Sequence, residues 1–278
     1  MCRWLAYHGP EIRLSTLLHD PEHSLLMQSK HATQSSWVVN GDGVGMGWYK
    51  DDPDPGQYRE TRAAWNDENV RSLARHVHSG LFMAHVRAVT QGVVSRTNTH
   101  PFLMGDWLFQ HNGDIGGYKL MQRAIDARIT DPWFGDRQGQ TDSETMFALA
   151  LTHGLRDDPA AGIVGMINTI LELRGEFGID DPFLMSIATT GGSDLWCARF
   201  SEGGTAPSLY WRRGLSLRNC DGSCTPLDDA ATIVVSEPLD TEALTWHEVP
   251  NCSLLHVDRD GVRVQPLQGV AGTSTPLA

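Results

Sequence analysis

The chain has 278 residues, of which 40% are hydrophobic and 20% are charged. This composition is typical of a globular protein with a substantial core and excludes an intrinsically disordered chain. The formal net charge of −12 argues against nucleic acid or an anionic membrane surface as a partner.

The lack of a recognisable targeting signal and the cysteine usage lead us to expect a protein of the cytoplasm. No run approaches the roughly 18 apolar residues of a transmembrane helix, and the N-terminus lacks the basic segment and long apolar core of a secretory signal. Five cysteines, at positions 2, 197, 220, 224 and 252, are spread thinly along the chain. Because an odd number at this density is not a disulfide framework, we expect reduced thiols and a cytoplasmic location.

The first predicted strand runs from Cys2 to His8 and is closed by Gly9 and Pro10. If Met1 is removed, Cys2 carries both a thiol and a free α-amino group. That amine has a reference pKa of about 7.7–8.0, so near neutral pH it can act as the base for its own thiol. For Cys2 alone, a small hydrophobe in a buried strand is the more favoured interpretation. If Met1 is retained, the free amine and this chemistry are lost.

Turn residues and apolar spacing predict the elements that follow. A short helix or loop is expected within residues 12–29, strands at 44–49, 81–87 and 106–111, and a helix at 63–78. Asn112-Gly113 is a strong turn signal, whose local interpretation is a tight turn that stops the third of these strands.

Helices and then strands are predicted in the second half of the chain. Helices are expected near 115–127, after Thr141, which fits a capping box with Glu144, and at 160–174. The later strands are expected at 183–189, 194–200, 207–212, 231–236, 253–258 and 262–267. This order predicts an α+β fold in which helices cover antiparallel sheets. With no internal repeat or linker, we expect one domain over residues 1–268 and a flexible polar tail over 269–278.

Several segments together resemble the glutamine amidotransferase domains with an N-terminal cysteine, which belong to the Ntn-hydrolase superfamily. The matching segments are residues 1–2 (MC), 84–92 (AHVRAVTQG), 100–102 (HPF), 111–113 (HNG) and 141–144 (TDSE), in the family's order and at roughly its spacing. Residues 208–211 (SLYW) and 235–239 (VSEPL) further resemble a stand-alone branch of hydrolases, typified by the ergothioneine-pathway γ-glutamyl amidase. The resemblance thus covers nearly the whole chain.

The resemblance implies a four-layer α/β/β/α sandwich with two antiparallel sheets, and it assigns the chemistry. Cys2 would attack a γ-glutamyl amide and form a thioester, with its own amine moving the proton. The side-chain amide of Asn112 and the backbone N–H of Gly113 would donate to the oxyanion.

The glutamyl group is a zwitterion, so its site needs one cation and one anion. By the resemblance, Arg87 would hold the α-carboxylate and Asp142 the α-ammonium. Thr90 and Gln91 match a loop that also touches the glutamyl group in the family. The stretch between Gln28 and Asn40, and residues 130–140, would form the acceptor side.

No segment is left over for a synthase domain, so we expect hydrolysis of a small-molecule γ-glutamyl amide to glutamate and an amine or ammonia. One alternative is a glutaminase subunit that delivers ammonia to a separate synthase. Another is a non-catalytic glutamine-binding regulatory protein, although such a protein would be expected to have lost its nucleophile or an oxyanion donor. A homo-oligomer is left open.

The histidines and cysteines do not predict a metal or another cofactor. His76 and His78 lie two residues apart without a further ligand motif, and Cys220 and Cys224 lack the second pair that completes a four-ligand zinc site. His85 is interpreted as structural, as is His100, because the α-amine already supplies the base.

Overall fold

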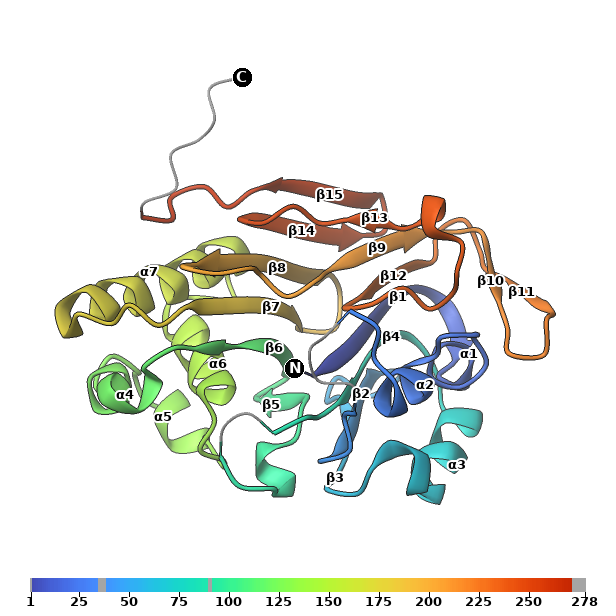
Figure 1. Cartoon of the computed structure of the whole chain (residues 1–278), viewed down its shortest axis with the longest axis horizontal. Helices are drawn as coiled ribbons and strands as arrows, with labels where there is room; N and C mark the ends of the chain where they lie inside the picture. Colours follow the sequence, from blue (N-terminus) through green and yellow to red (C-terminus); the bar gives the residue numbers. More distant parts are fainter. Residues whose placement is uncertain (1, 35–38, 90–91, 272–278) are drawn as a thin grey trace.

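Two antiparallel sheets packed face to face form the centre of the molecule (Figure 1). The computed structural model describes residues 2–34, 39–89 and 92–271. The first sheet contains, in spatial order, β13 (His247–Glu248), β9 (Tyr210–Arg213), β12 (Thr232–Val235), β1 (Arg3–Arg13), β4 (His78–Val86), β2 (Val44–Tyr49) and β3 (Gly56–Glu60). The second contains β15 (Gly261–Pro266), β14 (Ser253–Asp258), β8 (Leu195–Glu202), β7 (Phe183–Thr190), β6 (Trp107–Ile115) and β5 (Phe102–Met104). A separate hairpin is formed by β10 (Ser216–Arg218) and β11 (Cys224–Pro226).

Helices cover the outer face of each sheet. The first sheet is covered by α1 (Ser15–Leu18), α2 (Leu25–Lys30) and α3 (Glu68–His76). The second is covered by α4 (Tyr118–Asp126), α6 (Asp142–Thr152) and α7 (Pro159–Phe177), and α5 (Trp133–Asp136) packs against α6. Short 3₁₀ turns lie at Ala64–Asn66, Arg96–Asn98 and Ala243–Thr245. The α/β/β/α sandwich that the resemblance implied is therefore confirmed.

Three apolar clusters fill the spaces between these four layers. One lies under α1–α3, one under α4, α6 and α7, and the third lies between the two sheets. β1 contributes Leu5 and Tyr7 to the first of these clusters, and Trp4 and Ala6 to the cluster between the sheets. Because both faces of β1 are buried, its sequence is a continuous apolar run rather than an alternating one.

Most predicted elements are present, and apart from one helix start and two strand ends their ends are shifted by up to three residues. The helix predicted over 63–78 is shorter, because the Asp67 side chain caps α3 by accepting from the N–H groups of Asn69 and Val70. Thr141 caps α6 by accepting from the Glu144 N–H at 3.1 Å. The Glu144 carboxylate does not complete the reciprocal box but accepts from the N–H groups of residues 138 and 139.

Two predicted strand ends are wrong. β1 continues through Gly9 and Pro10 to Arg13, with an irregularity in its pairing with β4 after His8, and such a bulge accommodates proline. β6 likewise continues through Asn112-Gly113 to Ile115, so this pair is not a turn. In both strands, pairing with neighbouring strands overrides a local turn signal.

Near the C-terminal end, the structure describes residues up to 271. Asn168 holds residues 269–271 through hydrogen bonds to the Gly269 carbonyl at 2.8 Å and the Ala271 N–H at 2.9 Å. The single domain and its flexible tail stay predictions. Of the helices in the described ranges, none combines the length and the apolar composition that a bilayer-spanning segment needs.

Candidate active site

A narrow pocket lies where β1 begins, and it brings together residues that are far apart in the sequence. It is lined by Cys2, Arg87, Ala88, His100, His111, Gly113, Thr141, Asp142 and Ser143. One pocket therefore contains the predicted nucleophile Cys2 and the predicted oxyanion donor Gly113. It also contains Arg87 and Asp142, the two residues predicted to bind the charges of the glutamyl group. Thr90 and Gln91 lie outside the described residues.

The Cys2 thiol is half-buried and lies against the segment that follows β4. Its Sγ is 3.4 Å from the Ala88 carbonyl oxygen and 3.5 Å from the Ala88 nitrogen. Removal from water raises the pKa of this thiol, while the Ala88 backbone hydrogen bond and the positive charges of Arg87 and Arg3 oppose the rise. A thiol that is largely neutral at pH 7 needs a base at the moment of attack.

Asn112 and Gly113 lie in the interior of β6, where they pair with Ser186 and Met185 of β7. Asn112 is 1% exposed, and within the described residues both polar atoms of its amide lack a hydrogen-bond partner. A buried amide normally finds partners, so this one is an exception, and Asn112 itself is not among the residues that line the pocket.

Gly113 has a backbone φ of +147°, and a Cβ built there would lie 1.9 Å from the carbonyl oxygen of Leu184. No other residue fits this close approach of two strands without a shift of the backbone. The backbone at Gly113 therefore lines the pocket on one side and packs tightly against β7 on the other.

Arg87 and Asp142 supply opposite charges to the pocket. Arg87 directly follows β4, is 3% exposed and donates from Nη1 to the Val93 carbonyl at 3.3 Å. Burial lowers the pKa of Arg87, and the nearby acidic groups of Cys2, Asp42 and Asp142 counteract this effect. Because Asp142 is the first residue of α6, its carboxylate also lies at the positive end of the helix dipole.

Three buried histidines form the wall behind these groups. The rings of His85 and His100 stack with centroids 4.2 Å apart, and Nδ1 of His111 lies 2.8 Å from the Ser143 hydroxyl. Burial lowers the pKa of all three, to about 3 for His85. These rings are neutral at pH 7 and leave Arg87 as the cationic side chain among the pocket-lining residues named above.

Three tryptophans that could line the acceptor side, Trp4, Trp37 and Trp48, have different positions. Trp4 is fully buried between the sheets, and Trp48 packs over Gly56 next to the outer cluster under α1–α3. Trp37 lies outside the described residues.

Sequence reasoning missed one charged pair beside the nucleophile, Arg3 with Glu237. Arg3 is 1% exposed and donates from Nε to Glu237 Oε2 at 3.0 Å. The available signal was the charge itself, because an arginine inside a buried apolar strand requires a partner. The identity of that partner, 234 positions away, had no local signal.

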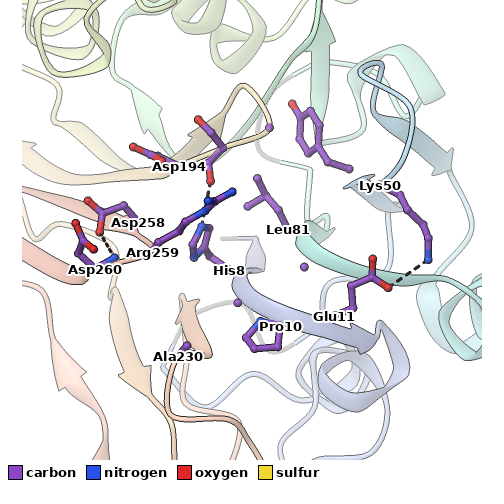
Figure 2. A pocket seen from close by; sticks show the side chains of 15 residues that line it. His8, Pro10, Glu11, Lys50, Leu81, Asp194, Ala230, Asp258, Arg259 and Asp260 are labelled. Atoms are coloured by element: carbon purple, nitrogen blue, oxygen red, sulfur yellow. Dashed lines mark hydrogen bonds and ion pairs between the residues drawn. The ribbon is translucent and has the colours of Figure 1, made fainter.

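A larger pocket of about 860 Å³ lies at the opposite end of β1 (Figure 2). It is lined by the β1 residues His8–Glu11 together with the turns after β2, β7 and β14. Lys50 pairs with Glu11 there at 3.3 Å. Since none of the predicted site residues lines it, this pocket is not where the proposed chemistry would occur.

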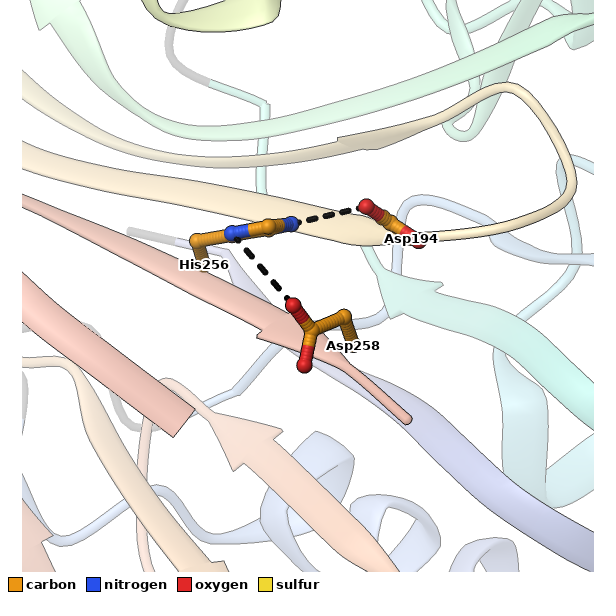
Figure 3. Close-up of side chains that lie close together, drawn as sticks. All are labelled: Asp194, His256 and Asp258. Carbon is orange, nitrogen blue, oxygen red and sulfur yellow. Dashed lines mark hydrogen bonds and ion pairs between the residues drawn. The ribbon is translucent and has the colours of Figure 1, made fainter. Parts of the chain in front are cut away.

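Beside this larger pocket, Asp194, His256 and Asp258 lie within 4.8 Å of one another (Figure 3). His256 Nε2 contacts Asp194 at 2.8 Å, and its Nδ1 accepts from Arg263 at 2.8 Å. The Arg263 guanidinium also pairs with Asp258. A cation of the chain thus already lies between the ring and the second carboxylate, so we interpret the cluster as a tie between the β7–β8 turn and the β14–β15 hairpin.

Comparisons with known sequences match most of this chain. Residues 23–199 match the family model described as class-II glutamine amidotransferases. The chain is 34% identical to the probable glutamine amidotransferase DUG3 of Saccharomyces cerevisiae, over 96% of this chain and 84% of that protein. It is 29% identical to the gamma-glutamyl-hercynylcysteine sulfoxide hydrolase of Mycobacterium tuberculosis, over 98% and 99% of the two chains.

Solved structures are similar over the same length. A glutamine aminotransferase class-II domain protein from Silicibacter pomeroyi matches with a TM-score of 0.70 and 31% identity, over 95% of this chain and 99% of that one. The glutamine phosphoribosylpyrophosphate amidotransferase of Bacillus subtilis matches with a TM-score of 0.63 and 14% identity, over 96% of this chain and 49% of that one, which is a likeness of fold alone.

Proposed function

Because the chain belongs to the class-II glutamine amidotransferase family, we propose that it hydrolyses γ-glutamyl amides with Cys2 as the nucleophile. The observation that carries this proposal is the pocket itself, in which a half-buried thiol faces an arginine, an aspartate and a glycine backbone. No metal or other cofactor is needed for this chemistry, because the thiol, its own amine and fixed dipoles suffice.

The proposed reaction has two halves. With Met1 removed, the Cys2 amine accepts the thiol proton while Sγ attacks the γ-carbonyl carbon. The C–N bond then breaks, the leaving amine takes the proton, and a γ-glutamyl thioester remains. Water, deprotonated by the same amine, attacks the thioester, and its collapse releases glutamate and regenerates the thiol.

Asn112 and Gly113 are proposed to stabilise both tetrahedral intermediates. Within the described residues the amide of Asn112 has no partner, which supports this role, since its N–H groups can meet the oxyanion without first breaking another such bond. Such preorganised donors act strongly in a site shielded from water.

Arg87 and Asp142 are proposed to bind the two charges of the glutamyl group. A guanidinium holds a carboxylate through two parallel hydrogen bonds, and a carboxylate at a helix start holds an ammonium. Thr90 and Gln91 are proposed as further contacts to the same group.

We propose an amine larger than ammonia as the leaving group, in a small-molecule substrate. The Mycobacterium tuberculosis relative, which matches this chain over nearly its full length, is named for hydrolysis of such a γ-glutamyl compound. A reducing cytoplasm is the proposed location, because all five cysteines are unbridged and two of them are exposed.

Intact mass spectrometry before and after incubation with 6-diazo-5-oxo-L-norleucine tests the proposal. We expect a starting mass without Met1, one adduct on Cys2, and release of glutamate from γ-glutamyl-p-nitroanilide by the purified chain. A Cys2→Ala variant is the control and should take no adduct.

Other outcomes separate the alternatives. Hydrolysis of L-glutamine that depends on an added partner protein would indicate a glutaminase subunit of a larger synthase. Retained Met1 with no adduct would contradict catalysis and favour a glutamine-binding regulatory protein.

A further inference from the structure

The side chain of the residue that follows the nucleophile is bonded to the backbone of the nucleophile. Arg3 is the first residue of β1, and Cys2 lies just outside this strand. The Arg3 guanidinium donates from Nη1 to the Cys2 carbonyl oxygen at 2.8 Å and from Nε to Glu237 Oε2 at 3.0 Å. One rigid group therefore holds both the backbone of the nucleophile and a buried carboxylate.

The same carboxylate also holds the chain segment that begins the proposed acceptor side. Glu237, 3% exposed, accepts from the N–H of Thr33 at 3.0 Å and from the N–H of Gln34 at 3.2 Å. The Thr33 hydroxyl donates to it as well, at 2.5 Å. The Glu237 backbone is fixed in turn, since its carbonyl accepts from the Gln28 side chain at 3.1 Å.

This arrangement matters because the polypeptide chain holds Cys2 through its C-terminal side only when Met1 is absent. Once Met1 is removed, Cys2 is the chain terminus, and its thiol and amine turn together about its own backbone. A misplacement of about 1 Å in a reacting group can cost 100-fold in rate. The planar guanidinium fixes two acceptors in one geometry, which the single ammonium of a lysine cannot do.

We propose that Arg3 and Glu237 are positioning residues of the active site. Arg3 fixes the orientation of the Cys2 thiol and amine, and Glu237 holds Arg3 while it also holds the backbone of residues 33–34. This inference rests on the proposed role of Cys2.

The chain offers a matched control pair. Arg212 and Asp240 form another buried ion pair, with Nη1 and Oδ2 2.9 Å apart and side chains 2% and 0% exposed. Neither residue lines the pocket at Cys2. Disruption of either pair should weaken the fold to a similar degree, so only a positioning role distinguishes them.

The test compares Arg3→Lys and Glu237→Gln with Arg212→Lys and Asp240→Asn. Steady-state hydrolysis of γ-glutamyl-p-nitroanilide is measured at a temperature where circular dichroism shows every variant folded. We expect kcat of the first two variants to fall by about 10- to 100-fold with KM within about threefold of wild type. The control variants should keep kcat within about threefold. Equal losses of kcat in both pairs would overturn the proposal.

Two readouts do not depend on turnover, so they separate this inference from the proposed function. Alkylation of Cys2 by iodoacetamide should become slower or less selective in Arg3→Lys than in Arg212→Lys. Amide hydrogen exchange at Thr33 and Gln34 should accelerate in Glu237→Gln but not in Asp240→Asn. If wild type hydrolyses no γ-glutamyl amide, the proposed function fails, whereas unchanged Cys2 alkylation and unchanged exchange would overturn the positioning role itself.

Discussion

The carboxylate of Asp142 accepts a hydrogen bond of 3.1 Å from the backbone N–H of Ile115. The first residue of α6 is thereby tied to β6 two residues after Gly113. A side chain proposed to bind the substrate ammonium is thus held in register with the strand that carries the proposed oxyanion donors.

Replacement of Asp142 by Asn should separate these two roles. The amide oxygen can still accept from the Ile115 N–H, the bond that the second carboxylate oxygen accepts from the Ser143 N–H is lost, and so is the charge for the ammonium. Loss of one partner of a buried charge pair costs about 2 kcal/mol or more, so we expect KM for γ-glutamyl-p-nitroanilide to rise at least about 30-fold. Glutaryl-p-nitroanilide, which lacks the α-amine, is the control. A preference for the γ-glutamyl substrate that equals wild type would contradict the ammonium clamp.

Asn112→Ala should lose activity without losing stability. Removal of one oxyanion donor typically lowers kcat by about 10²–10³, with little change in KM. Because the Asn112 amide is buried without a partner in the described structure, its removal leaves no new unsatisfied group. Thermal unfolding should therefore occur at the wild-type temperature or above it. A clear drop in Tm would mean that this amide supports the fold instead.

Gly113→Ala should damage the fold itself. The added Cβ would meet the Leu184 carbonyl at 1.9 Å, and the φ of +147° is strained for any other residue. Gly175, in the last turn of α7, is the matched control, because among the described residues its would-be Cβ meets no atom within 4 Å besides its chain neighbours and its own helix backbone. Alanine there should raise stability by about 0.5–1 kcal/mol. Urea unfolding of both variants measures the contrast, and a native-like Gly113→Ala variant would contradict the close packing of β6 on β7.

The sequence predicted best the elements whose signal is local. The spacing of Ile163, Met166, Ile167 and Ile170 marks α7, and the buried run after Cys2 marks β1, because these patterns directly reflect which face is covered. The short edge strands β3, β5 and β13 were missed, since an edge strand of two to five residues has little apolar alternation of its own.

The sequence predicted which motifs form the site, but it did not predict how their residues are arranged in space. The tight turn expected at Asn112-Gly113 shows the difference, because the pairing with β7 that keeps this pair extended comes from residues about 70 positions later. The Arg3–Glu237 contact depends on the same kind of distant neighbour. Local residue preferences cannot encode such contacts, although they can indicate that a buried charge must have a partner.

The buried histidines should make the fold sensitive to acid. The pKa of His85 is lowered to about 3 by burial, whereas the unfolded value is near 6.5. Between these values the unfolded state binds the extra proton, so the stability from neutral burial is fully present above pH 6.5 and is lost as the pH falls toward 3. In His85→Gln this loss is absent, so the stability gap to wild type should narrow by about 1.4 kcal/mol per pH unit below pH 6. Urea titrations at pH 7, 6 and 5 check this, and parallel pH curves would contradict a neutral His85.

The requirement for a free α-amine at Cys2 can be tested without changing any residue of the pocket. Two proteins are produced from a cleavable tag, one beginning at Cys2 and one with a single glycine before it. Both should fold and expose the same thiol, but in the second the amine becomes an amide nitrogen that cannot accept a proton. General base catalysis contributes typically about 10²–10⁴-fold, so kcat for γ-glutamyl-p-nitroanilide should fall by at least about 100-fold in the extended protein. Alkylation by iodoacetamide, measured by mass spectrometry, should still reach Cys2 in both. Equal kcat values would show that the base is another group of the pocket.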